Sequence, residues 1–153
     1  MTVSPRTLSQ RAVALLARRE HSRAELVRKL APHAGPDDDL DALLDRLEAG
    51  GMLSDRRYAE QVAHQALRRH GSMRVEQRLR MNGVSGETLD VALDAARARE
   101  PEAALAVLRK RFAEPPATRE AWAAQARYLH NRGFRPEVIH QVLRARGDDE
   151  SPA

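Results

Sequence analysis

Two arginines one helical turn apart, Arg74 and Arg78, have no acidic residue three or four positions away in the helix expected around them. Residues at these spacings are neighbours on a helix, and like charges there cost about 0.2–0.5 kcal/mol per pair. An arginine without a nearby carboxylate keeps its planar fork of donors available for a phosphate or carboxylate of another molecule. We therefore interpret this pair as part of a surface that binds an anionic partner.

Further arginines lack a helical acid in the same way, and 24 of the 26 basic residues of the chain are arginine. The candidate anion-binding residues are Arg18, Arg19, Arg68, Arg69, Arg74, Arg78, Arg109, Arg127 and Arg132. Other basic residues have an acid one turn away and are expected to form solvated pairs, namely Lys29 with Glu25, Arg56 with Glu60 and Arg80 with Glu76. The alternative is a charged face that only keeps an arginine-rich protein in solution.

Residue types that carry catalysis or hold cofactors are missing or poorly spaced. The chain has no cysteine, and its six histidines form no His-Glu-x-x-His motif, so we expect no metal site. The glycines do not form a Gly-x-x-x-x-Gly-Lys-Ser/Thr phosphate loop, and Asp55 and Glu87 are explained as acids at helix starts. We expect no catalytic residue and no cofactor, and hence a protein that is not an enzyme.

The elements that position these arginines are predicted to be helices throughout. A leucine, a glycine four residues later and an apolar residue directly after it recur as Leu47/Gly51/Met52, Leu79/Gly83/Val84 and Leu129/Gly133/Phe134. A helix that ends at a glycine and is followed by an acidic helix start is typical of a small helical unit used repeatedly. The fold class is therefore predicted to be all-α, as a tandem array.

Apolar spacing and capping residues predict nine helices in three sets of three. Helices are expected over 7–19, from Ser22 to a stop at Pro32, from Pro36 through Leu47, from Ser54 to His70, around Val75 and Leu79, from Ser85, from Pro101 to Phe112, through Trp122 and Leu129, and over 136–146. The expected modules are 7–52, 53–99 and 100–147, with flexible termini at 1–6 and 148–153. Leu79 is expected to be buried.

Net positive and net negative blocks alternate along the chain, which gives an array of helices a basic face and an acidic face. The five aromatic residues lie beside apolar stripes, so we interpret them as core residues and expect nucleic-acid contact mainly through phosphates. No apolar run approaches the roughly 20 residues that span a bilayer, and the first ten residues lack a secretory signal. We expect a cytoplasmic protein without membrane contact.

Several stretches of the chain match the motifs of a known family. LARREHSRAELVRKL at 16–30 is similar to the opening signature of the RecX family of bacterial regulators of the RecA recombinase. GMLSDRRYA at 51–59, Gly71 through Val75 to Leu79, and NGVS at 82–85 resemble its second module, and YLHNRGF at 128–134 with Ile139 resembles its third. The resemblance covers residues 10–146 in the family's order.

The resemblance implies an elongated, curved array of three three-helix modules that binds in the groove of the RecA filament on DNA and inhibits or modulates the RecA ATPase and strand exchange. The implied partners are the RecA filament and DNA phosphates without sequence specificity, with no cofactor. Because the chain shows no dimerising heptad, we expect a monomer. Two alternatives stay open, a helix-turn-helix DNA-binding regulator and a helical-repeat adaptor for another protein.

Overall fold

The computed structural model describes residues 4–148, and within this range every regular element is helical. The elements are α1 (Leu8–Arg18), α2 (Arg23–Leu30), the short 3-10 helix η1 (Ala31–His33), α3 (Leu40–Ala49), α4 (Asp55–Ala66), α5 (Ser72–Met81), α6 (Gly86–Arg111), α7 (Arg119–Asn131) and α8 (Pro136–Asp148). No strand occurs among these residues, so the all-α prediction is confirmed. The terminal segments expected to be flexible lie largely outside the described range.

Helix starts follow the capping residues of the sequence. Thr7 and Ser22 each begin a capping box. In this motif the hydroxyl accepts from the backbone amide three residues later, and the side chain of that later residue accepts from the backbone amide of the capping residue. Ser54 caps α4 in the simpler way, by accepting from the Arg57 amide. The start expected near Pro36 is wrong, because Asp39 accepts from the Ala42 amide and so fixes the first turn of α3 at Leu40.

The three glycines of the repeated pattern all adopt the left-handed conformation, with φ of 76° at Gly51, 75° at Gly83 and 80° at Gly133. In each of the three turns, the amide of the residue after the glycine donates to the carbonyl of the leucine four positions before the glycine. The distances are 2.9, 3.0 and 3.2 Å respectively. This is the Schellman geometry, which favours glycine because a side chain is strained there. The turns follow α3, α5 and α7, so the first one ends a module whereas the other two lie inside a module.

A single helix, α6, replaces two of the nine expected helices. It runs for 26 residues from Gly86 to Arg111 and continues through Pro101, where the sequence predicted a new start. Proline in a helix interior costs about 3 kcal/mol. Here the helix buries Leu89, Leu93, Val107 and Leu108 in two different clusters, and this packing outweighs the penalty. The predicted module boundary at 99/100 therefore falls inside α6.

Buried apolar side chains form three separate clusters along the chain. One joins α1, α2, α3 and Leu53, the second joins α4, α5 and the first half of α6, and the third joins the second half of α6 with α7 and α8. Leu79 is completely buried, as predicted. Tyr58 and Phe134 are also buried, and the other aromatics pack against the third cluster, which confirms their interpretation as core residues.

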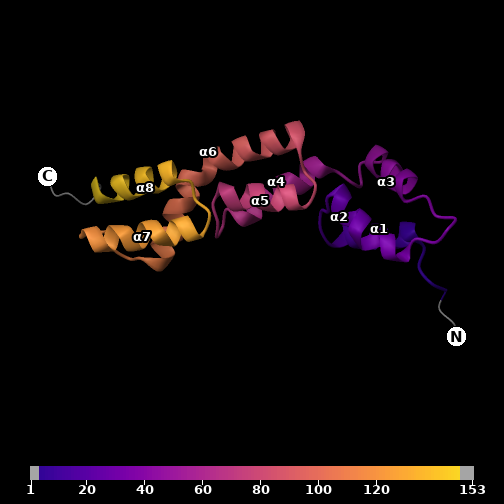
Figure 1. Cartoon of the computed structure of the whole chain (residues 1–153), viewed down its shortest axis with the longest axis horizontal. Helices are drawn as coiled ribbons and strands as arrows, with labels where there is room; N and C mark the ends of the chain where they lie inside the picture. Colours follow the sequence, from indigo (N-terminus) through magenta and orange to yellow (C-terminus); the bar gives the residue numbers. More distant parts are fainter. Residues whose placement is uncertain (1–3, 149–153) are drawn as a thin grey trace.

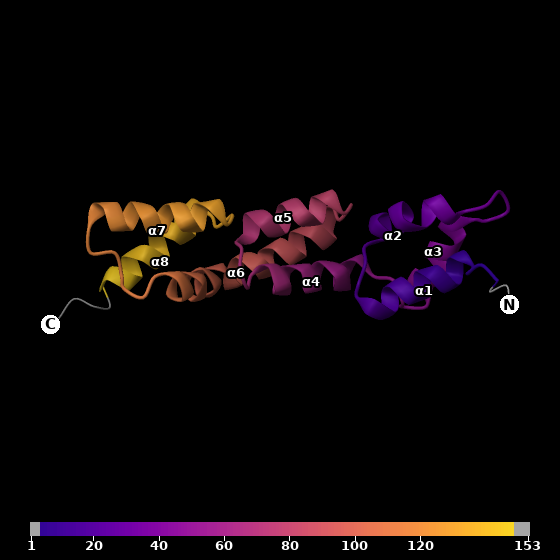
Figure 2. The same ribbon diagram turned by 90° about the horizontal axis from the view of Figure 1, so that it is seen from below.

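The clusters lie in a row, so the molecule is long and gently curved, with the first module at one tip and α7 and α8 at the other (Figure 1; Figure 2 gives the view from below). In Figure 2, α2, α5 and α7 lie along one side of the row.

The described residues contain no helix that combines the length and apolarity needed to cross a bilayer.

Backbone hydrogen bonds join the second and third modules. The Gly71 amide donates to the Arg132 carbonyl at 2.9 Å and the Met73 amide to the Gly133 carbonyl at 3.1 Å. A Cβ on Gly71 would lie 2.4 Å from the Gly133 carbonyl oxygen and from the Phe134 Cα, so only glycine permits this approach. The start of α5 is thereby held against the end of α7.

Candidate functional site

The junction between the first and second modules contains a hollow of about 620 Å³, which we call the junction hollow. It is lined by Arg28 of α2 and by a run of side chains from the end of α4 to the end of α5. Those residues are Ala66, His70, Arg74, Gln77, Arg78, Met81 and Asn82. The lining includes three arginines and no acid, so its chemistry suits an anion.

Helix α5 turns its arginines toward this hollow because its other face is buried. Val75 and Leu79, one turn apart, are fully buried in the second cluster. Arg74 and Arg78 are also one turn apart, each directly before one of these apolar residues, and both are exposed. The sequence therefore places two guanidinium groups side by side on the outer face of α5, as the spacing predicted.

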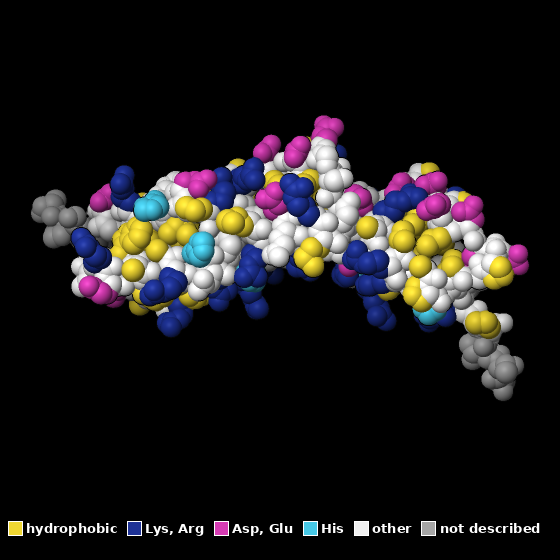
Figure 3. Space-filling model, viewed as in Figure 1, with side chains coloured by type: hydrophobic (Ala, Val, Ile, Leu, Met, Phe, Trp, Pro, Cys, Tyr) yellow, Lys and Arg dark blue, Asp and Glu magenta, His cyan; other side chains and the backbone are white. Residues whose placement is uncertain are grey.

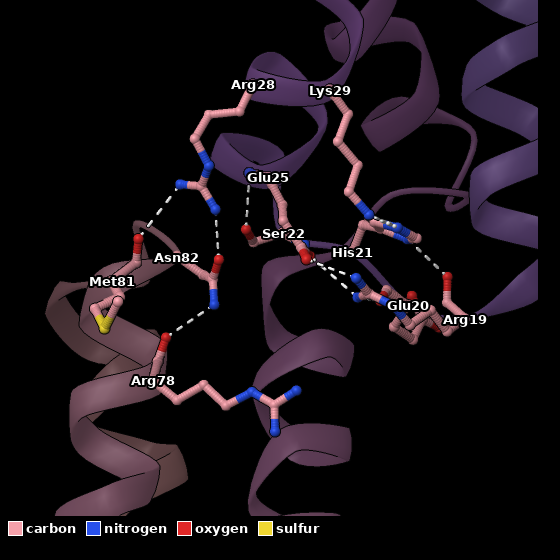
Figure 4. Close-up of polar contacts among 10 residues, drawn as sticks. All are labelled: Arg19, Glu20, His21, Ser22, Glu25, Arg28, Lys29, Arg78, Met81 and Asn82. Carbon is pink, nitrogen blue, oxygen red and sulfur yellow. Dashed lines mark hydrogen bonds and ion pairs between the residues drawn. The ribbon is translucent and has the colours of Figure 1, made fainter.

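Arg28 connects the two modules across the hollow (Figure 4). Its Nη2 donates to the Asn82 Oδ1 at 2.6 Å and its Nη1 to the Met81 carbonyl at 3.3 Å. Asn82 in turn donates from Nδ2 to the Arg78 carbonyl at 3.0 Å. The Arg78 guanidinium makes no ion pair or hydrogen bond with the described residues, and in Figure 4 it extends away from this network. Arg78 thus keeps its donors available for a partner.

His70 marks the point where the arginines of the second and third modules meet. Burial lowers the pKa of its imidazole, and the positive charges of Arg74, Arg132, Arg69 and Arg78 lower that pKa further. The ring is therefore neutral at pH 7, because its ordinary value is already 6.5. Four guanidinium groups thus act on one side chain, which indicates a concentrated positive potential.

Two of these arginines are held by the opposite module. Arg74 Nη2 donates to the Asn131 carbonyl at 2.9 Å, and Arg132 Nη1 donates to the Arg69 carbonyl at 3.1 Å. The Arg132 guanidinium also lies over the Tyr128 ring, 4.6 Å from its centroid. These contacts fix the positive groups in place and leave them partly available.

We call the group around the junction hollow and His70 the central basic strip, which comprises Arg28, Arg69, Arg74, Arg78, Arg132 and His70. It draws on all three modules. Figure 3 shows dark-blue Lys and Arg side chains along the lower, concave edge of the molecule, while most magenta acids lie along the upper edge. On the face drawn, the lower edge is thus mainly basic, whereas the upper side carries acids together with some basic side chains.

The structure brings together only part of the predicted residue set. Arg19 is paired, because its Nη2 lies 2.7 Å from the Glu25 Oε1. Arg18 lines a separate hollow in the first module, and Arg109 lines one between α6 and α8. Arg68 and Arg127 are exposed, and no contact with the central basic strip places them in it.

Sequence reasoning missed Arg28 and His70. A signal for Arg28 was available, because Leu26 and Leu30 define the buried face of α2 and position 28 falls on the opposite face. His70 was considered as a metal ligand and assigned no role in the site, although Arg68, Arg69 and Arg74 flank it in the sequence. Its proximity to Arg132 depends on packing between modules and has no sequence signal.

Two of the three expected solvated pairs are confirmed. Arg56 lies 3.2 Å from Glu60 and Arg80 lies 3.0 Å from Glu76. The pair of Lys29 with Glu25 is wrong, because Glu25 binds Arg19 and the Ser22 amide, and the Lys29 Nζ instead lies 3.2 Å from the His21 Nε2 (Figure 4). Among the described residues, no group of His, Cys, Asp and Glu is arranged to hold a metal ion.

Comparison with known proteins gives three matches to family models, one for each part of the array. The matched models are the first three-helix domain of RecX over residues 10–47, the second over 54–93 and the third over 99–143. Together they span most of the chain in the family's order.

Curated relatives match along nearly their whole length. The regulatory protein RecX of Leptothrix cholodnii is 47% identical over 138 residues, which cover 90% of this chain and 88% of that protein. The protein of the same name from Herbaspirillum seropedicae is 42% identical and is covered to 95%, as is this chain. The crystal structure of RecX from Lactobacillus salivarius superposes with a TM-score of 0.72 at 17% identity, over 92% of this chain and 94% of that one, which shows the same fold.

Proposed function

This chain belongs to the RecX family of regulatory proteins, and from that premise we propose that it binds the RecA filament on DNA and inhibits or modulates the RecA ATPase and recombinase activity. It acts by occupancy, without a catalytic residue or cofactor of its own. Its partners are the RecA filament and DNA phosphates, which it meets in the cytoplasm as a monomer.

The observation that carries the proposal is the central basic strip, which is continuous across three modules. Arg28, Arg78 and Arg132 come from α2, α5 and the end of α7, and none of them has an ion pair with a carboxylate within residues 4–148. A long surface of one charge fits a long anionic partner better than it fits a small anion. Charge complementarity of this kind raises the rate of encounter and fixes the orientation of the complex.

The length of the array suits a polymer. Because the positive groups are distributed over three modules rather than one, we infer that the chain contacts more than one RecA subunit at once, with DNA phosphates within reach of the same face. Arg18, Arg68, Arg109 and Arg127 lie outside the strip and remain candidate contacts of this complex, whereas Arg19 is already neutralised by Glu25.

The helix-turn-helix alternative needs base-reading side chains near the start of one exposed helix, and usually a dimer. The start of α5 is instead packed against the third module, where Gly71 contacts the backbone of Gly133 and Phe134. The strip residues also come from several helices. This arrangement favours binding to a filament over reading of a DNA sequence.

The test is to titrate the chain into RecA assembled on single-stranded DNA while ATP hydrolysis is followed. Loss of turnover at substoichiometric amounts indicates that growth at filament ends is blocked, and saturation near a fixed ratio indicates occupancy along the groove. Unchanged turnover at a large excess of the chain contradicts the proposal and favours the adaptor alternative. Retained binding to DNA without RecA, with no effect on turnover, favours the DNA-binding alternative.

A further inference from the structure

A second basic hollow lies in the first module and shares no residue with the junction hollow. This N-terminal hollow has a volume of about 330 Å³. Arg6, Arg11 and Arg18 line it from the N-terminal segment and α1, and Lys29 and His33 line it from the end of α2 and from η1. Its remaining lining is apolar, formed by Ala14, Leu15 and Leu30.

Local structure explains why the positive groups converge here. Arg11 and Arg18 are seven residues apart on α1, which is two helical turns, so they lie on one face of the helix. The capping box of Thr7 and Gln10 fixes the direction in which the chain enters α1, and so it positions Arg6 directly before the helix. The buried Leu30 anchors the end of α2 beneath them.

Among residues 4–148, no carboxylate neutralises these positive groups. Arg6, Arg11, Arg18 and Lys29 take part in no ion pair with any residue between 4 and 148. Lys29 is directed to the ring nitrogen of His21, which carries no negative charge. Four uncompensated positive charges around one small hollow repel one another, and an anion of high charge relieves that repulsion.

We propose that the N-terminal hollow binds a nucleotide, with the phosphate groups on the arginines and Lys29 and with the base against Ala14 and Leu15. The volume is at the lower end of the range of small-molecule sites, which is about 300–1,000 Å³, and the site joins apolar lining to a few charged donors as such sites do. Nucleoside triphosphates and the nucleotides of a DNA strand share this chemistry. Binding at this site does not depend on RecA.

An acidic peptide matches the hollow less well. Successive side chains of an extended peptide point to opposite sides, so adjacent carboxylates do not enter the same small space. The linked phosphates of a nucleotide bring several negative charges together, and arginine forks bind phosphate oxygens in pairs. The hollow thus favours concentrated charge attached to a flat, partly apolar group.

The experiment measures binding of a fluorescent ATP analogue to the full chain without RecA, followed by displacement with ATP, inorganic tripolyphosphate, a short oligothymidylate and an acidic peptide. We expect saturable binding, displaced by ATP or by the oligothymidylate at lower concentration than by tripolyphosphate or the peptide. Stronger displacement by ATP assigns the site to free nucleotides, and stronger displacement by the oligothymidylate assigns it to a DNA strand.

Matched variants locate the binding. Arg11→Gln and Arg18→Gln should each raise the dissociation constant about tenfold, the value of one lost charge-assisted contact. Arg144→Gln removes the same charge from an exposed position on α8, outside the hollow, and should leave binding unchanged. Equal losses in all three variants, equal displacement by tripolyphosphate or the peptide, or no binding at millimolar analogue would overturn the proposal. Circular dichroism of each variant checks that the helices are intact.

Discussion

Glu100 and Arg135 form an ion pair of 2.6 Å between the Glu100 Oε2 and the Arg135 Nε, and the glutamate is completely buried. The same carboxylate accepts from the Ser72 amide and hydroxyl and from the Arg135 amide. A single side chain of α6 thus accepts from helix-start amides of both α5 and α8 that have no partner within their own helix. Glu100 therefore links the second and third modules.

Replacement of Glu100 by glutamine should destabilise the protein by about 3 kcal/mol or more, because the variant removes the buried carboxylate that pairs with Arg135 and leaves Arg135 only the longer contact with Glu137, at 3.7 Å. Urea unfolding followed by circular dichroism measures the change. Glu102→Gln is the matched control, since Glu102 is exposed two residues further along α6 and should change stability by less than about 0.5 kcal/mol. Equal stability of the two variants would show that Glu100 does not link the modules.

Leu79→Ala should lower the free energy of unfolding by about 2–5 kcal/mol, because Leu79 is fully buried in the second cluster. Met81→Ala removes an apolar side chain of similar size from the same helix, but Met81 is 71% exposed and its loss should be nearly neutral. Thermal melts of the two variants make the comparison. An unchanged melt for Leu79→Ala would mean that the cluster does not support the second module.

Gly71→Ala should separate the second and third modules at the start of α5. The added Cβ would meet backbone atoms of Gly133 and Phe134, which have no flexible side chain to move aside, so we expect a loss of about 1–3 kcal/mol. Gly147→Ala adds the same atom in open space at the end of α8 and serves as the control. Hydrogen exchange at the Gly133 turn should increase only in the first variant, and equal protection in both would refute this packing.

Stability should fall as the pH drops below about 6.5, because burial lowers the pKa of His21 from its ordinary value of 6.5. The Nδ1 atom of His21 lies 3.0 Å from the Arg19 carbonyl, and its Nε2 atom faces the Lys29 ammonium, which can only donate. The folded ring is therefore neutral. The positive charges of Arg19 and Lys29 oppose its protonation, although the charge of Glu25 favours it. The unfolded chain therefore binds the proton first, and stability is lost from pH 6.5 down to the lowered pKa.

Unfolding of the native chain and of His21→Gln between pH 7.5 and 5.5 measures this effect. The variant should show a smaller loss of stability across that interval than the native chain, whatever its stability at pH 7.5. His130→Gln, which changes an exposed histidine, should keep the native slope. Identical slopes for all three proteins would remove His21 as a source of the pH dependence.

The sequence was sufficient for most of the helices and for the outer face of α5, because apolar spacing and capping are local. Val75 and Leu79 predicted the buried face, and Arg74 and Arg78 then fell on the opposite one. Helix α6 was not predictable in the same way, because the penalty of Pro101 is local whereas the packing that overcomes it involves two clusters. The module boundaries stay predictions.

The candidate site was predicted only in part for a related reason. Pairs within one helix, such as Arg80 with Glu76, follow from spacing. Arg19 instead reaches Glu25 across the turn between α1 and α2, and Arg28 reaches Asn82 in another module. Contacts between elements decide which arginines remain available, and a single sequence does not encode them in any local pattern.

The central claim is that the open guanidinium of Arg78 contributes to filament binding, and Arg78→Glu tests it with Arg80→Glu as a matched control. Both positions are exposed on α5, but Arg80 lies 3.0 Å from Glu76 whereas Arg78 lines the junction hollow without an ion pair in the described chain. A substitution of Arg74 alone is a less direct test, because the Arg74 side chain also donates a hydrogen bond to the Asn131 carbonyl of the third module.

The decisive measurement is the concentration of each variant that halves ATP hydrolysis by RecA on single-stranded DNA, with helicity checked by circular dichroism. Loss of one charged contact costs about tenfold in affinity, and charge reversal adds repulsion, so Arg78→Glu should require at least about ten times more protein than the native chain. Arg80→Glu should stay within about threefold of the native value. Full inhibition by Arg78→Glu at the native concentration would contradict the account.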